Sequence, residues 1–343
     1  MSKRSELIRK RVVQTATVAG ARAQYGKSRG RIVAEPLFIL CPPRSFSTIV
    51  SIMLGQHPQM YALPETNLFG AENMREWWAQ CARASHNMDH GLLRAVAELY
   101  FGEQTEAGIA LARGWLRRRS HFSSGYLMEQ LADRVYPKHL IDKSPSTTYS
   151  PQSLGRVFAM FPRARFIHLV RHPRGHGASV MKRLEFVARR RKVPQWIVDL
   201  ASFPMGPGGA AADGELDPQG SWYALNRNIC EFLASVPEEQ RMLVQGEALI
   251  TDPDRGLRNI ASWMGLRTDS KAIEEMKHPE ASPYARIGPP GAELGNDILF
   301  LRNPFLRSSR AEPYRLDGPL AWRNDGAGFS PLVKDLARQF GYE

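Results

Sequence analysis

Residues 37–48 read Leu-Phe-Ile-Leu-Cys-Pro-Pro-Arg-Ser-Phe-Ser-Thr, and this stretch decides what fold the rest of the chain has to build. The short apolar run that ends at Cys41 predicts a buried strand, because two prolines follow it and cannot continue a sheet. From Ser47 to Leu54 the pattern predicts a helix, which Gly55 ends. A strand, a tight turn and a helix N-terminus bring backbone N–H groups and the helix dipole together, which suits a bound phosphate or sulfate.

The turn itself carries the candidate anion donors. The two prolines have no N–H and stiffen the entry, so the donors begin after them and comprise Arg44, Ser45, Phe46, Ser47 and Thr48. Arg44 adds a planar guanidinium group that matches two oxygens of one anion. The Gly-Lys pair of a nucleoside-triphosphate loop is absent, which disfavours a kinase or an ATPase.

A second strand and turn carry another basic group. Phe-Ile-His-Leu-Val at 166–170 predicts a strand, Arg171 follows it directly, and Ser179 lies about two turns into the next predicted helix, which runs to about residue 190. Arg171 and Ser179 converge only if that helix folds back beside its strand, as crossover connections do. Ligands of open parallel sheets bind at the carboxyl ends of strands, so we expect this pair to lie near Arg44.

The remaining pattern alternates strands with helices, which predicts an α/β fold with a parallel sheet covered on both faces. Further strands are predicted at 139–142 and 241–245, and helical periodicity at 70–135, 222–233 and 253–264. The segments 203–220 and 279–310 are rich in Gly, Pro or Arg and predict loops, the second of them a closing loop.

The charge of the chain is uneven. It carries 46 Lys and Arg against 34 Asp and Glu, a net +12, and residues 1–32 alone hold nine basic residues and one acid, or +8. We therefore separate a basic N-terminal arm, 1–32, from a single domain, 33–343. The arm is either a solvated tail or a docking segment for an acidic partner or a membrane surface.

Cysteine content and hydropathy place the chain in a broad class. Three cysteines without a Cys-x-x-Cys pair argue against a disulfide framework or structural zinc, so we expect no metal. No apolar run approaches the ~20 residues needed to span a bilayer, and no secretory signal opens the chain. These features favour a soluble, cytoplasmic protein.

Taken in order, the motifs resemble those of PAPS-dependent sulfotransferases, in particular bacterial enzymes associated with polyketide synthases. Pro43 to Thr48 resembles the family's 5′-phosphosulfate loop, and Phe166 to Pro173 with Ser179 resembles its 3′-phosphate segment. Weaker matches are Leu63-Pro-Glu-Thr66, Ile141-Asp-Lys-Ser-Pro145, Gly220-Ser-Trp-Tyr223 and Gly246-Glu247.

The resemblance implies a three-layer α/β sandwich related to P-loop NTPases. It also implies transfer of a sulfuryl group from PAPS to an acceptor hydroxyl, with PAP as product. Its site residues fall into three groups: Glu65, Lys143 and Arg44 for catalysis; residues 44–48, Arg171 and Ser179 for the donor phosphates; and Tyr223, Arg286 and Gly288 as further donor contacts.

Two positions depart from the family pattern. Phe46 stands where the loop has glycine, and a phenylalanine is strained if that position needs a positive φ. Pro145 stands where the cytosolic branch has a histidine base. Glu65-Thr66 matches the pair used by the tyrosylprotein branch, so we take Glu65 as the candidate base, with a histidine elsewhere as the open alternative.

Other functions remain as alternatives. Arg171-His172 is similar to the Arg-His pair of phosphohydrolases that phosphorylate the histidine. A basic nucleic-acid-binding protein would need aromatic residues among its basic ones, and the arm has only Tyr25, so we expect no nucleic-acid partner. For the acceptor we favour a small-molecule, lipid or acyl alcohol, enclosed by segments near 68–136 and 190–220.

Overall fold

The computed structural model describes residues 34–84, 87–188, 217–307 and 314–343. Its centre is a five-stranded, wholly parallel sheet in the order β2-β3-β1-β4-β5. The strands are β1 (Leu37–Leu40), β2 (Met60–Ala62), β3 (His139–Asp142), β4 (Arg165–Val170) and β5 (Arg241–Gln245). The chain places β2 and β3 on one side of β1 before it crosses to β4 and β5 on the other side. The crevice at the carboxyl ends of the central strands, where this change of side occurs, is therefore the expected ligand site.

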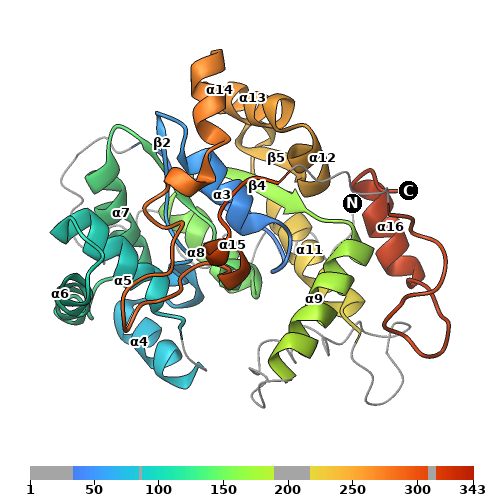
Figure 1. Cartoon of the computed structure of the whole chain (residues 1–343), viewed down its shortest axis with the longest axis horizontal. Helices are drawn as coiled ribbons and strands as arrows, with labels where there is room; N and C mark the ends of the chain where they lie inside the picture. Colours follow the sequence, from blue (N-terminus) through green and yellow to red (C-terminus); the bar gives the residue numbers. More distant parts are fainter. Residues whose placement is uncertain (1–33, 85–86, 189–216, 308–313) are drawn as a thin grey trace.

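Alternation along the strands divides the core into two layers of side chains. Phe38, Leu40 and Phe166 face one cluster, whereas Leu37, Ile39 and Ile167 face the other. The first cluster packs under α4 (Met74–Arg83), α5 (His90–Val96), α6 (Glu106–Arg117), α7 (Ser124–Val135), α8 (Pro151–Met160) and α11 (Gln219–Leu233). The second packs under α3 (Ser47–Gly55), α12 (Gly246–Thr251), α13 (Pro253–Trp263) and α14 (Ser270–Met276). The predicted three-layer α/β architecture is confirmed (Figure 1).

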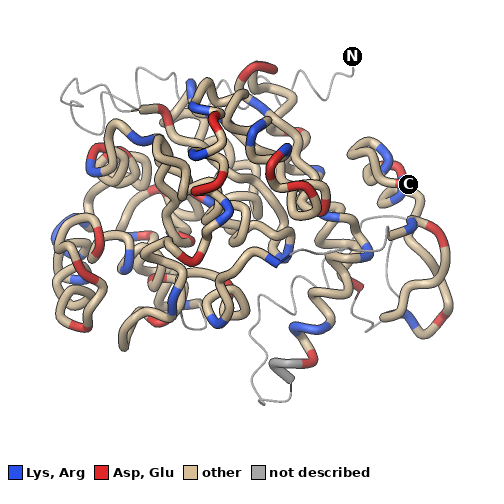
Figure 2. The backbone as a smooth tube through the Cα atoms, turned by 45° about the horizontal axis from the view of Figure 1, so that its top comes forward, with Lys and Arg blue, Asp and Glu red and all other residues tan. Residues whose placement is uncertain are grey.

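The remaining elements extend this frame. α9 (Pro173–Ala188) follows β4, and α16 (Pro331–Gln339) packs on α11 around buried Trp222 and Phe340. Short helical turns lie at η1 (Leu68–Gly70), η2 (Ala97–Phe101), η3 (Pro145–Thr148), η4 (Glu238–Gln240), η5 (Pro279–Ala281) and α15 (Ile298–Arg302). Lys and Arg and Asp and Glu are interspersed over the described backbone (Figure 2).

The sequence predictions can be compared element by element. All four predicted strands are present, within one residue of the expected bounds, and the helices expected at 47–54, 222–233 and 253–264 are there. The segment 279–310, for which the sequence predicts only loop, contains two short helical turns. Strand β2 and helix α16 were not predicted. The basic arm, most of the 203–220 loop and the last residues of the helix expected to reach about 190 lie outside the described residues.

Candidate active site

Four strands deliver the candidate residues to one edge of the sheet. Arg44 follows β1, Glu65 follows β2, Lys143 follows β3 and Arg171 follows β4. Because all four strands run parallel, these positions meet at their shared carboxyl end. The sequence prediction that the two basic turns converge is therefore correct in geometry.

The turn after β1 is conformationally strained. Arg44 and Phe46 both have positive φ, 69° and 60°, in the left-handed region that non-glycine residues rarely occupy. The phenyl ring is held in place, because the guanidinium group of Arg171 lies over it at 4.3 Å from the ring centroid. On its other side the ring lies so near Gly246 that a Cβ there would come within 2.5 Å of it. The strain foreseen for Phe46 is thus present, and cation–π contact and packing offset it.

The loop after β1 and the pair Arg171 and Ser179 form one continuous cluster. Arg171 Nη1 donates to the carbonyl of Arg44 at 2.7 Å, and Arg44 Nε donates to Ser179 Oγ at 3.2 Å. Burial first, and then the charges of Arg171 and Arg183, lower the pKa of Arg44 to about 10. The pKa of Arg171 is lowered by burial as well. Two partly buried arginines with lowered pKa values are unfavourable alone and favour an anion as their counter-charge.

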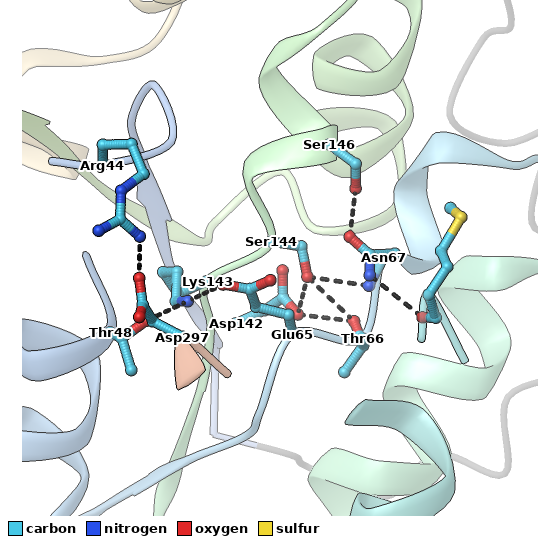
Figure 3. A network of polar contacts seen from close by, with 11 residues as sticks. Arg44, Thr48, Glu65, Thr66, Asn67, Asp142, Lys143, Ser144, Ser146 and Asp297 are labelled. Atoms are coloured by element: carbon cyan, nitrogen blue, oxygen red, sulfur yellow. Dashed lines mark hydrogen bonds and ion pairs between the residues drawn. The ribbon is translucent and has the colours of Figure 1, made fainter. Parts of the chain in front are cut away.

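The second half of the site joins the candidate base to the loop (Figure 3). Lys143 has no exposed surface, and its Nζ donates to Thr48 Oγ1 at 3.1 Å and forms an ion pair with the Glu65 carboxylate. The Glu65 side chain is 30% exposed and lines the cavity. The ammonium group therefore lies between the anion-binding loop and the carboxylate.

A buried network holds this arrangement from below (Figure 3). Asp142 accepts hydrogen bonds from Thr66 Oγ1 at 2.7 Å and from Ser144 Oγ at 3.1 Å. Ser144 Oγ in turn accepts from the backbone N–H of Asn67 at 3.0 Å. Burial raises the pKa of Asp142 to about 6, although the two hydroxyl groups lower it. These bonds join the segment after β2, which carries Glu65 and Thr66, to the end of β3, which carries Asp142.

A cavity of about 1250 Å³ opens above these groups. Its charged lining consists of Arg44, Glu65, Arg171, Arg183 and Asp297. The remaining wall is uncharged and includes Asn67, Gln80, Met88, Ser146, Tyr149 and the 298–300 segment. One end of the cavity therefore suits an anion, and the rest suits a neutral group.

Several predicted donor contacts lie elsewhere. Tyr223, Arg286 and Gly288 do not line the cavity; Arg286 is exposed, and Gly288 packs near Arg94. Ser45 is buried beneath the loop, whereas Phe46, Ser47 and Thr48 line the wall.

Three cavity or network residues were missed by sequence reasoning: Asp142, Arg183 and Asp297. A charged residue ending an apolar strand was the signal available for Asp142, and the i+4 spacing from Ser179 was the signal for Arg183. Asp297 comes from the far segment 294–300 and had no local signal.

The described residues hold neither a cluster of metal ligands nor a membrane-spanning helix. Within 34–84, 87–188, 217–307 and 314–343, no three His, Cys, Asp or Glu side chains are grouped so as to hold a metal ion. Across the same ranges, every helix is too short or too polar to cross a bilayer.

Comparisons with known proteins agree with this geometry. The sequence profile described as "Sulfotransferase family" matches residues 36–270. The solved sulfotransferase domain from the Synechococcus PCC 7002 olefin synthase is 25% identical, with a TM-score of 0.65 over 93% of this chain and 99% of that one. The sulfotransferase domain from the curacin biosynthetic pathway shares the fold at 20% identity, with a TM-score of 0.64 over 92% and 99% of the two chains. Among curated proteins, none matches the sequence.

Proposed function

The chain belongs to the sulfotransferase family, and we propose that it transfers the sulfuryl group of PAPS to a hydroxyl of a small-molecule, lipid or acyl acceptor, releasing PAP. The observation that carries this proposal is the contact between the two basic turns, in which Arg44 touches both Ser179 and Arg171. A single phosphate needs one such turn, whereas a nucleotide with phosphates at both its 5′ and 3′ positions uses two.

The residues fit such a donor. Arg171 lines the cavity, and its Nε is a buried atom without a hydrogen-bond partner in the described part of the chain; buried polar groups are rarely left so. The first N–H groups of α3 have no partner within the helix either, and their dipole favours an anion. When bound, PAPS supplies a sulfuryl group activated by its anhydride bond to phosphate.

The chain's own groups would then act mainly by positioning and by offsetting charge. Loop residues 44–48 hold the 5′ end, and Arg171 with Ser179 holds the 3′-phosphate. Glu65 accepts the proton of the attacking hydroxyl, while the sulfur–oxygen bond to the phosphate breaks. Lys143, between Thr48 and Glu65, offsets the charge that grows on the departing oxygen.

The cavity supports a neutral acceptor. Its volume of about 1250 Å³ exceeds the ~300–1,000 Å³ typical of single-ligand pockets, which leaves room for a second substrate beside the nucleotide. Among the described residues, the wall beyond Glu65 carries no charged side chain apart from those already named.

No observation favours the alternative functions. The phosphohydrolase alternative needs His172 to reach a substrate, but this side chain is buried and does not line the cavity. Its Nδ1 accepts a hydrogen bond from the backbone N–H of Arg174, and burial lowers its pKa to about 4. The basic arm, on which nucleic-acid binding would depend, lies outside the described residues.

Nucleotide discrimination tests the proposal. Isothermal titration calorimetry should show that PAP binds at least ~10-fold more tightly than 5′-AMP, because a 3′-phosphate adds charge-assisted bonds to Arg171. Equal affinities for the two nucleotides would contradict the proposal.

A further inference from the structure

The carboxylate of Asp297 is already paired with the guanidinium group of Arg44, which would hold the donor. Asp297 Oδ2 forms an ion pair with Arg44 Nη1, and each side chain is only 20% exposed (Figure 3). The two residues lie 253 positions apart in sequence. Both line the cavity, so the pair stands inside the proposed donor site.

The backbone fixes the segment that carries this carboxylate. Buried Arg94 donates from Nη1 to the carbonyl of Leu294 at 2.8 Å. The next carbonyl, that of Gly295, accepts the backbone N–H of Glu65 at 2.7 Å. Asp297 is therefore delivered to Arg44 by an anchored strap that also touches the candidate base, and the contact is not a chance meeting of surface side chains.

The two carboxylate oxygens have separate tasks. Oδ1 accepts the backbone N–H of Leu299 at 2.7 Å and so caps α15, while Oδ2 faces Arg44. An asparagine at this position keeps the capping oxygen and the side-chain shape but loses the charge. The electrostatic role can therefore be removed without removing the cap.

The surrounding charges explain why a carboxylate would be placed there. Arg171 and Arg183 both act on Arg44, and without an anion the three positive groups repel one another. A nearby carboxylate stabilises the donor-free site, but it also repels an incoming phosphosulfate and has to be separated from Arg44 before the donor can bind.

We propose that Asp297 is an internal anion that holds Arg44 until the donor arrives, and that it thereby sets the affinity for the 5′ end of the donor. This inference rests on the proposed function, since it takes the donor to be a nucleotide phosphosulfate. Asp297 acts through Arg44 and is a positioning residue. Leu299 and Phe300 of the same segment line the neutral part of the cavity, so this segment borders both the donor and the acceptor side.

The test compares Asp297→Asn with the wild-type chain and with a matched variant, Glu293→Gln. Glu293 lies on the same segment and is paired with His90, away from Arg44. Calorimetry with PAP, 5′-AMP and inorganic pyrophosphate measures the anion site with and without nucleotide recognition. Steady-state kinetics with PAPS separates KM from kcat.

We expect Asp297→Asn to bind all three probes ~5- to 10-fold more tightly than wild type, as the loss of a partly buried competing ion pair predicts. Its KM for PAPS should fall while kcat is retained, and the ligand-free variant should melt at a lower temperature. Glu293→Gln should leave the three affinities unchanged.

Several outcomes would overturn the inference. Unchanged or weaker pyrophosphate binding by a folded Asp297→Asn variant contradicts it, even if the wild type binds PAP. A large fall in kcat at unchanged affinity would make Asp297 a catalytic group instead. Failure of the wild type to prefer PAP over 5′-AMP contradicts the proposed function, and the pyrophosphate measurement still decides the role of Asp297.

Discussion

Replacing Glu65 by glutamine removes the proposed base and its ion pair with Lys143 but keeps the size and shape of the side chain. Lys143 is fully buried and would retain Thr48 Oγ1 at 3.1 Å as a partner. Removing one partner of a buried charge costs about 3–5 kcal/mol. The Glu65 side chain is 30% exposed, and glutamine keeps an oxygen that can accept from Lys143, so we expect roughly half of that cost, about 2 kcal/mol. In a chain of 343 residues, a loss of this size lowers the melting temperature by about 3 °C.

Turnover should fall much further than stability. General-base help contributes typically ~10²–10⁴-fold, or about 3–5 kcal/mol of activation free energy. Affinity for PAP should stay within about threefold, because Glu65 is hydrogen-bonded to neither Arg44 nor Arg171 and its charge is the smallest of the named influences on Arg44. Rapid quench of PAP formation measures the rate, and calorimetry measures the affinity.

The control variant is Glu35→Gln. Glu35 also pairs with a basic residue, exposed Arg163, but it precedes β1 and lies at the opposite end of the strands. This variant should keep full turnover. A Glu65→Gln enzyme with wild-type turnover would refute the base assignment, and one that no longer binds PAP would show that Glu65 supports the site by other means.

Further variants test the remaining parts of the site and its support. Lys143→Met should lower kcat/KM by about 10²–10³-fold with the fold retained; an active variant would rule out the charge-offsetting role. Arg171→Lys cannot both stack on Phe46 and form bidentate bonds, so the ratio of PAP to 5′-AMP affinity should fall about tenfold, and an unchanged ratio would contradict the assignment. His168 is buried against Asn226, and burial lowers its pKa to about 4, so the unfolded chain binds a proton that the folded chain does not as the pH falls from 6.5 to 4. Stability present above pH 6.5 should be lost over that window, by up to about 3 kcal/mol from His168 alone, and His168→Gln should remove that share of the pH dependence in urea denaturation. His172 and His176, whose pKa values burial also lowers, should keep their own shares.

Hydrophobic runs were enough to predict most of the fold. Strand β4 is apolar except for Arg165 at its start and buried His168, and it lies between Pro162 and Pro173; such strands belong to sheets buried on both faces. Strand β2 has only three residues, Met60–Ala62, and pairs on one side alone, so its pattern is too short to stand out. Helix α16 was overlooked although Ser330 caps it and Pro331 opens it, which is a readable start signal.

The site could be predicted wherever its residues follow a strand directly. Arg44, Lys143 and Arg171 come soon after predicted strands, and parallel pairing brings them together. Glu65 follows β2, which was not predicted, and only the family resemblance pointed to it. The same reasoning could not place residues of the segment 279–310, because no predicted strand directly precedes them. The resemblance suggested Arg286 for that segment, yet Asp297 is the residue that reaches the cavity, because the contacts at Leu294 and Gly295 set the path of the chain.

The central claim is that this cluster of arginines, a lysine and a glutamate transfers a sulfuryl group from PAPS. The most direct measurement incubates the purified chain with PAPS carrying radiolabelled sulfur and a metabolite and lipid extract, and follows both labelled product and PAP by chromatography and mass spectrometry. We predict a labelled sulfate ester of a neutral alcohol, formed in equal amount to PAP and absent with Lys143→Met. No labelled ester in any extract, or equal labelling with the Lys143→Met enzyme, would contradict the account.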